Sequence, residues 1–264
     1  MTKSVHFNIP LIVYKCIQYL IPNYLQTEGI FRRSGNRKTI QSLKFAIDSG
    51  NICYDKLFKS VDCYDVCDLL KHFFQELPEP VINEKIQSEL LLIFTNPSLK
   101  DAPAKISLMK DLFKAQLHSN ELQLLSCLCT MLNEFGSQSE YNKMSPSNLA
   151  CVWAPNIIWS RAPSDPMVLL QKIKSYTPLV EFLIIESRSI FEHPNIFKQS
   201  ESLPSNDNRN KENIDDSNLD MMDFSNLGSK VYRKSMPPLG TKTYSSFGNI
   251  SRRKEVLWEV SWLV

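Results

Sequence analysis

The sequence predicts an all-α protein, a single helical-bundle domain followed by a disordered C-terminal tail. Three observations carry this prediction. Apolar residues recur at spacings of three and four along most of the chain. Glycine is scarce, with seven in 264 residues. No run of alternating apolar and polar residues indicates a sheet. We place the domain at residues 1–196 and the tail at 197–264, where the composition turns polar.

The first three helices are read from their apolar faces and their boundary residues. A helix is expected over Ile9–Leu20, and Pro22 should end it because proline lacks the N–H that a helix needs. A second helix should begin after Asn36, whose side chain suits an N-cap, and end at Gly50. A third is expected over Val61–Leu77, where the apolar face is broad and two prolines follow.

The rest of the domain contains five further expected helices. They are Ile86–Phe94, Lys105–Leu117, Glu121–Phe135, Pro146–Trp153 and Val168–Phe191. Glu121–Phe135 is apolar nearly all round, which indicates a central position. Ser119 and Ser145 are predicted N-caps. Pro155 should stop the fourth of these helices, and Pro178 should kink the last.

Charge and cysteine usage exclude several classes of function. The formal net charge is only +2, so we expect no nucleic-acid partner. We find no signal peptide and no apolar run long enough to cross a membrane. The seven cysteines form no CxxC pair, and the four histidines stand at no zinc-ligand spacing to them. We therefore expect reduced core thiols, a cytoplasmic protein, no metal and no cofactor.

The tail carries weaker signals. Its basic run near residues 252–254 could contact anionic lipid, but too weakly to anchor the protein. Its last nine residues, VLWEVSWLV, turn apolar again. They could dock on the domain, bind a partner, or have no specific role.

Three segments far apart in the chain place polar residues beside apolar anchors. They read TEGIFRRSG from Thr27, LLKHFFQELPEPV from Leu69 and NKMSPSNLACVWAPN from Asn142. In this order and spacing they resemble the GTPase-activating domain of the RhoGAP family, over about residues 6–195. The first matches that family's arginine loop. The second matches its LKxFFRELPxP motif except at one position, and the third matches its NKMxxxNLA motif throughout.

The resemblance implies a function and a set of site residues. The chain would accelerate GTP hydrolysis by a Rho- or Rac-class small GTPase in its GTP-bound state, and so switch off signalling to the cytoskeleton. Arg32 would be the catalytic arginine, inserted in trans. Lys71 and Asn148 would support the arginine loop and contact the GTPase, and Arg33 would be a less critical neighbour. Asn142 is expected to act as a structural cap.

Two features depart from the family's pattern. Gln75 stands where the family usually has arginine, one turn after Lys71, and this should weaken the partner interface or shift partner preference. The family usually also has another helix before Ile9. The alternative function is therefore a GTPase-binding or scaffolding module with weak or no activation. A stand-alone enzyme is a third hypothesis, but the sequence offers it no nucleophile–base pair and no metal cluster.

Overall fold

The computed structural model describes residues 9–50, 53–160 and 165–191, and these form helices joined by loops, with no β-strand among them. The helices are α1 (Leu11–Tyr24), α2 (Arg37–Asp48), α3 (Tyr54–Lys59), α4 (Cys63–Glu76), α5 (Glu84–Thr95), α6 (Ala102–Gln116), α7 (Ser119–Ser137), α8 (Ser139–Asn142), α9 (Pro146–Ile157), α10 (Pro166–Ile185) and α11 (Ser187–Phe191). The all-α prediction is confirmed. The expected domain boundary after residue 196, and the whole tail, lie outside the described residues.

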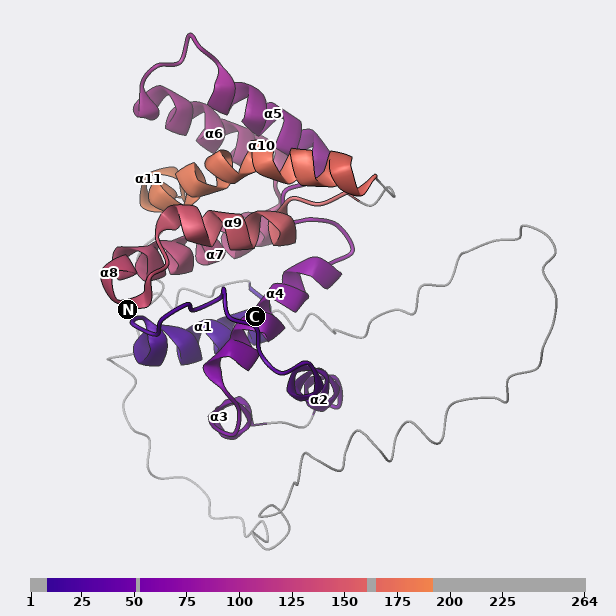
Figure 1. Ribbon diagram of the computed structural model, residues 1–264. Coiled ribbons are helices and arrows are strands. Elements are labelled where there is room, and N and C mark those ends of the chain that lie inside the picture. Colours follow the sequence, from indigo (N-terminus) through magenta and orange to yellow (C-terminus); the bar gives the residue numbers. More distant parts are fainter. Residues whose placement is uncertain (1–8, 51–52, 161–164, 192–264) are drawn as a thin grey trace, which may run out of the picture.

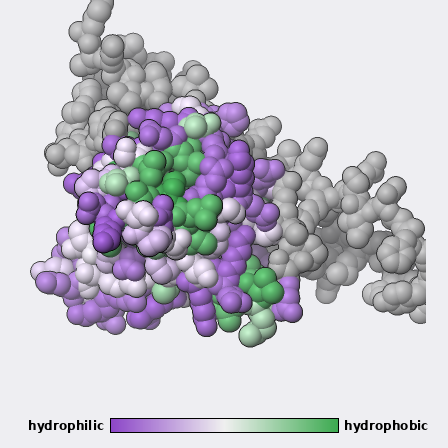
Figure 2. Space-filling model, turned by 90° about the horizontal axis from the view of Figure 1, so that it is seen from above, coloured by the Kyte–Doolittle hydropathy of each residue, from purple (hydrophilic) through white to green (hydrophobic). Residues whose placement is uncertain are grey.

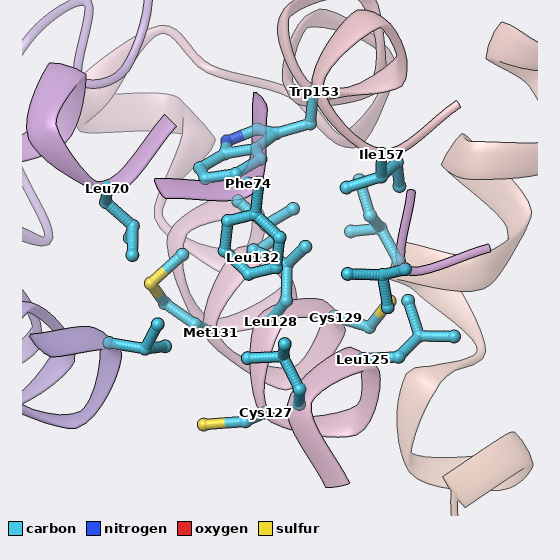
Figure 3. Close-up of a cluster of buried hydrophobic side chains, with 14 of the residues drawn as sticks. Leu70, Phe74, Leu125, Cys127, Leu128, Cys129, Met131, Leu132, Trp153 and Ile157 are labelled. Carbon is cyan, nitrogen blue, oxygen red and sulfur yellow. The ribbon is translucent and has the colours of Figure 1, made fainter. Parts of the chain in front are cut away.

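α7 is the centre of the bundle, as its all-round apolar pattern predicts. It packs against α1, α9, α10 and α11, while α4 contacts both α1 and α2 on one side and α5 contacts α6 on the other (Figure 1). Side chains of α7 such as Leu128 and Met131 meet Phe74 of α4 and Trp153 of α9 in the core (Figure 3). Phe74 and Trp153 lie edge to face, with ring centroids 5.7 Å apart. This core joins the three segments that resemble family motifs.

Several predicted helix ends are confirmed by their hydrogen bonds. The Asn36 side chain accepts from the backbone N–H of Lys38 at 2.9 Å and so caps α2. Gly50 follows α2 with a φ of 76°, a left-handed conformation that glycine adopts without steric cost. Ser145 caps α9 by accepting from the N–H of Asn148 at 3.2 Å.

The prediction that Pro22 and Pro155 end their helices is wrong. Each proline lies inside a helix that continues for two more residues, α1 to Tyr24 and α9 to Ile157. So close to a helix end, proline removes only one intrahelical hydrogen bond. In both helices the next residue is an asparagine that donates its side-chain amide to the carbonyl four residues back, at 2.7 Å. This side-chain bond stabilises the final turn that each proline weakens.

Three other expectations about helix ends need correction. His118, and not Ser119, is the N-cap residue of α7, because the Glu121 side chain accepts its backbone N–H at 3.0 Å. The helix expected over Val168–Phe191 is divided into α10 and α11 at Glu186, whereas Pro178 lies inside α10. The short helices α3 and α8 were not predicted, since six and four residues show no usable periodicity.

Apolar side chains also reach the surface on the side of α5, α6 and α10. Figure 2 shows this side from above, with apolar residues gathered between polar ones. The most exposed large apolar residues on these three helices are Met167 at 72% and Leu92 at 70%. In Figure 1 this side is opposite α1, α2 and α3. Within the described ranges, no helix is both long enough and apolar enough to cross a membrane.

Candidate functional site

The loop between α1 and α2 turns sharply at Gly29. Gly29 has a φ of 71°, and its carbonyl accepts the backbone N–H groups of both Arg32 and Arg33, at 3.0 and 2.9 Å. Its own N–H donates to the carbonyl of Asn142 at 2.8 Å. Gly29 therefore forms the turn of this loop. The two arginines extend from a closed turn that is bonded to the start of the third motif.

Phe31 anchors this loop in the core. Its φ of 63° is uncommon for a residue with a bulky side chain and costs about 1–3 kcal/mol. The ring is fully buried and lies edge to face against Phe135 and Trp153, with centroids 5.0 and 5.5 Å away. Burying a phenylalanine stabilises by roughly 1.5–3 kcal/mol, which offsets the backbone strain. Ile30 is fully buried beside it, so the Ile30–Phe31 pair fixes the loop to the core.

Lys71 of α4 holds the same turn from the opposite side. Its Nζ donates to the Phe31 carbonyl at 2.8 Å and lies 2.6 Å from the Asp68 carboxylate. The other oxygen of Asp68 accepts the backbone N–H of Gly35 at 2.9 Å. Lys71 and Asp68 are both more than four-fifths buried, so screening by solvent is weak. The pair therefore ties both ends of the arginine-bearing turn to α4.

Gly35 is needed for the close approach of the loop to α4. A Cβ at this position would lie 2.5 Å from the Asp65 carboxylate and 2.7 Å from its Cα. Asp65 uses the close approach to accept the N–H of Asn36 at 2.6 Å. Burial raises the pKa of Asp65, although the N–H groups of Asn36 and Asp62 act in the opposite direction. The loop therefore leaves the site pressed directly against α4.

Arg32 and Arg33 differ in their surroundings. Arg32 is exposed, and its guanidinium makes no hydrogen bond or ion pair with any residue that the structure describes. Arg33 instead donates from Nη1 to the Tyr64 hydroxyl at 3.1 Å, with its guanidinium carbon 4.9 Å from the centre of the Tyr64 ring. One arginine is therefore available to a partner, while its neighbour is engaged within the molecule.

Asn142 joins three parts of the fold, a larger role than the predicted cap. It is fully buried, and its side-chain amide donates to the carbonyls of Leu25 and Phe135, each at 2.8 Å. Its side-chain oxygen accepts the N–H of Met144 at 2.8 Å. Because its own carbonyl accepts from Gly29, Asn142 links the ends of α1 and α7 to the arginine loop.

Asn148 lies at the exposed start of α9, next to this junction. Its amide donates to the carbonyl of Lys143 at 3.2 Å. Lys143 has a left-handed φ of 59° and directly follows Asn142. Asn148 therefore supports the chain segment to which the arginine loop is bonded. Its predicted contact with a GTPase stays a prediction.

Gln75 is exposed one turn beyond Lys71, and its side chain is hydrogen-bonded within the molecule. Its Nε2 donates to the Asn156 side-chain oxygen at 2.5 Å, and the Asn156 amide continues to the Val152 carbonyl at 2.7 Å. Asn156 is 2% exposed, so this chain of bonds links α4 to the core of α9. Gln75 is thus a neutral residue that is engaged within the molecule.

The structure brings the predicted residues together through backbone bonds. Arg32 lies on a turn whose carbonyls and N–H groups bond to Lys71 and to the segment that Asn148 supports. Sequence reasoning missed Tyr64, Asp65 and Asp68, although their spacing with Lys71 along α4 is a helical-face pattern. No group of His, Cys, Asp and Glu residues in the described ranges could hold a metal ion. The group that this site can offer to a partner is the exposed guanidinium of Arg32, on a loop whose backbone is held by hydrogen bonds.

Comparison with known proteins gives a consistent family. A model of the RhoGAP domain matches residues 10–162, more than half of the chain. The chain is 31% identical over 185 residues to Rho GTPase-activating protein 68F of Drosophila melanogaster, covering 70% of this chain and 37% of that protein. It is also 31% identical over 196 residues to human Rho GTPase-activating protein 25, covering 74% of this chain and 29% of that protein.

Solved structures agree at the level of the fold. The structure of human Rho GTPase activating protein 15 is similar with a TM-score of 0.62 and 25% identity, over 69% of this chain and 84% of that one. The BH domain of Graf, a GTPase regulator associated with focal adhesion kinase, gives a TM-score of 0.57 at 21% identity, over 69% and 93%. The chain spans well under half the length of the curated relatives it matches.

Proposed function

The chain belongs to the RhoGAP family, and we propose that it accelerates GTP hydrolysis by Rho- or Rac-class small GTPases, with Arg32 inserted in trans as the catalytic arginine. The bound GTP belongs to the GTPase, so the chain contributes one side chain to a reaction whose substrate another protein holds. The partner is the GTP-bound state, in which that substrate is present.

The chemistry of the reaction explains the use of an arginine. Negative charge on the transferring phosphoryl group must be neutralised in the transition state. A guanidinium stays charged and can donate to two oxygens at once. For Ras, such an arginine accelerates hydrolysis by about 10³–10⁵-fold, or roughly 4–7 kcal/mol of barrier. An arginine that is already positioned before binding delivers more of this effect than a flexible one.

The observation that carries the proposal is the mounting of Arg32. Its side chain is exposed and unpaired within the described part of the chain, while the backbone at Gly29 and Phe31 is bonded to α4 and to Asn142. A lone cation gains nothing for the stability of the free protein in this position. A rigid backbone with a free charged tip is what insertion into a phosphate site requires.

Lys71, Gln75 and Asn148 are the proposed supporting residues around Arg32. Lys71 is largely buried and bonded to the loop, so we assign it mainly to holding the Phe31 carbonyl. Gln75 lies on α4 and Asn148 lies at the start of α9, and both side chains are exposed. We assign both to contact with the GTPase.

A second candidate function has one specific observation in its favour. Gln75 lacks the positive charge expected at its position and is bonded to Asn156. A GTPase-binding module with weak activation would result if that missing charge reduced engagement with the switch region. We also propose a cytoplasmic location, which the seven free cysteines fit because such thiols persist in a reducing compartment.

Single-turnover GTP hydrolysis by Rho, Rac and related GTPases tests the proposal. We expect the full chain to accelerate hydrolysis by at least one of them. Arg32→Ala should remove the acceleration, by about 10³-fold or more, while binding to the GTPase in a transition-state mimic persists. The matched control is Arg188→Ala on α11, which also removes an exposed arginine. Binding without acceleration by the wild type would leave only the second candidate.

A further inference from the structure

Tyr64 bonds to the arginine loop at two points, the Glu28 carbonyl and the Arg33 side chain. Its hydroxyl donates to the Glu28 carbonyl at 2.8 Å and accepts from Arg33 Nη1 at 3.1 Å. The Arg33 guanidinium also covers the Tyr64 ring. Two parts of the loop, the Glu28 carbonyl and the Arg33 guanidinium, therefore meet at one side chain of α4.

Gly29 lets the Arg33 side chain cross the turn to reach Tyr64. A Cβ at Gly29 would lie 3.0 Å from both Cγ and Cδ of Arg33. The aliphatic stem of Arg33 thus lies directly over the bare Cα of Gly29, and its guanidinium ends over the Tyr64 ring. We call Tyr64 and Arg33 together the strap.

The strap helps to fix the orientation of one peptide plane, that between Glu28 and Gly29. The peptide between Glu28 and Gly29 donates its N–H to the Asn142 carbonyl at 2.8 Å and presents its carbonyl oxygen to the Tyr64 hydroxyl at 2.8 Å. Hydrogen bonds at its two opposite ends fix the rotation of this plane. The next carbonyl along, that of Gly29, accepts the N–H groups of Arg32 and Arg33 and so sets the start of the Arg32 side chain.

The other attachments of the loop do not replace the strap. Lys71 holds the Phe31 carbonyl on the inner side, and Asp65 and Asp68 hold the exit at Gly35 and Asn36. Among the described side chains, Tyr64 alone bonds to the Glu28 carbonyl. Without its hydroxyl, the Glu28–Gly29 peptide keeps one bond and can rock about it.

We propose that Tyr64, acting with Arg33, is a positioning residue that sets the orientation of Arg32 for catalysis. This inference rests on the proposed function, because it assigns the strap to the placement of the catalytic arginine. A displacement of about 1 Å in a catalytic group can cost about 100-fold in rate. Rocking of one peptide is a smaller disturbance. We therefore expect a loss of about 5- to 10-fold in the maximal stimulated rate, corresponding to one neutral hydrogen bond.

The test variant is Tyr64→Phe in the full chain, which removes only the hydroxyl. Stimulated GTP hydrolysis should show a maximal rate lower by about 5- to 10-fold, with the half-saturating concentration within about twofold of wild type. The thermal unfolding midpoint should stay close to that of wild type. The matched control is Tyr14→Phe, since among the described residues the Tyr14 hydroxyl bonds only to Gln18 of its own helix. It should leave rate and saturation unchanged.

Amide hydrogen exchange gives a readout that does not depend on activity. In Tyr64→Phe, the N–H groups of Gly29, Arg32 and Arg33 should exchange about 5- to 10-fold faster, while those of Leu69 and Leu70 in α4 do not change. Unchanged exchange at the three loop amides would overturn the inference, even if the chain activates no GTPase. Faster exchange with an unaltered maximal rate, in a wild type that Arg32→Ala inactivates, would overturn the assignment to catalysis and leave the proposed function intact.

Arg33→Met tests whether the strap acts as a unit. Methionine keeps an unbranched stem over Gly29 but removes the guanidinium. Because both changes disrupt the same contact, Arg33→Met combined with Tyr64→Phe should reduce the maximal rate much less than the product of the two single effects. A full product would show that Arg33 and Tyr64 act separately, and would remove Arg33 from the inference.

Discussion

The two arginines of the loop are adjacent in sequence but have opposite surroundings. Arg32 makes no hydrogen bond or ion pair with the described residues and extends from a turn bonded to α4 and to Asn142, whereas Arg33 is engaged by Tyr64. Resemblance to a family motif was sufficient to select Arg32. No sequence signal indicated the partner of Arg33, because Tyr64 lies 31 residues further along the chain and contacts it only in the folded state.

Gln75 provides a test at the residue scale. Gln75→Arg should increase activation, by about 2- to 5-fold in the maximal rate divided by the half-saturating concentration. An arginine can still donate to the Asn156 oxygen that Gln75 now uses, and it adds a charge toward an anionic partner.

The control for this change is Gln171→Arg on α10, which adds the same charge at an exposed position away from the loop. It should have no effect. If Gln75→Arg lowers activation, the interpretation of position 75 as a weakened GTPase contact is wrong.

At the scale of elements, α4 is the support of the site. Four of its residues, Tyr64, Asp65, Asp68 and Lys71, bond to the arginine loop from one face of the helix. The existence of α4 and its buried face could be predicted from apolar spacing. The role of its polar residues could not, because an aspartate on a helix looks the same in sequence whether it faces water or a buried backbone N–H.

The two prolines show a second limit at this scale. Pro22 and Pro155 were expected to stop helices, and both are followed by one more half-turn. In each case a following asparagine donates to a helical carbonyl. Proline propensity describes the average cost in a helix interior and not the cost at an end that a neighbouring side chain stabilises.

Asn142→Ala tests the junction of α1, α7 and the arginine loop. The change leaves the Leu25 and Phe135 carbonyls and the Met144 N–H without their partner. Buried groups that lose a partner cost about 1–3 kcal/mol each, so urea unfolding should show a free energy of unfolding lower by about 3 kcal/mol or more.

Asn148→Ala is the control for that loss of stability. Asn148 is exposed in the same region and makes one side-chain bond to a backbone carbonyl. Its removal should change the free energy of unfolding by about 0.5 kcal/mol at most. Equal destabilisation by the two variants would contradict the view that Asn142 is the structural residue and Asn148 the surface one.

For the whole molecule, one aromatic cluster connects the site to the core. Phe31, Phe74, Phe135 and Trp153 come from the loop, α4, α7 and α9, and their rings meet edge to face. The all-α class and the central place of α7 could be predicted because periodicity reports burial. The mutual contacts of these rings could not, since periodicity does not say which helices are neighbours.

The same core predicts how the seven cysteines react. Cys53 and Cys151 are exposed, and the other five are buried. Burial raises the pKa of Cys127 to about 12 and that of Cys16 further still, so their reactive thiolates are nearly absent at neutral pH. In the native protein a water-soluble thiol reagent should therefore label two cysteines quickly, and the other five only on unfolding.

Mass spectrometry of the labelled protein identifies the reacting residues. The double variant Cys53→Ser, Cys151→Ser should take up no label under native conditions. Rapid native labelling of Cys127 would contradict the buried position of that side of α7.

The central claim is that Arg32, and not Arg33, completes the active site of the GTPase. The most direct measurement is single-turnover GTP hydrolysis by the responsive GTPase with Arg32→Lys and Arg33→Lys compared side by side, since both keep the charge and lose the planar guanidinium. We predict that Arg32→Lys lowers the stimulated rate by about 100-fold or more, whereas Arg33→Lys stays within about tenfold of wild type. Equal losses, or a larger loss for Arg33→Lys, would contradict the account.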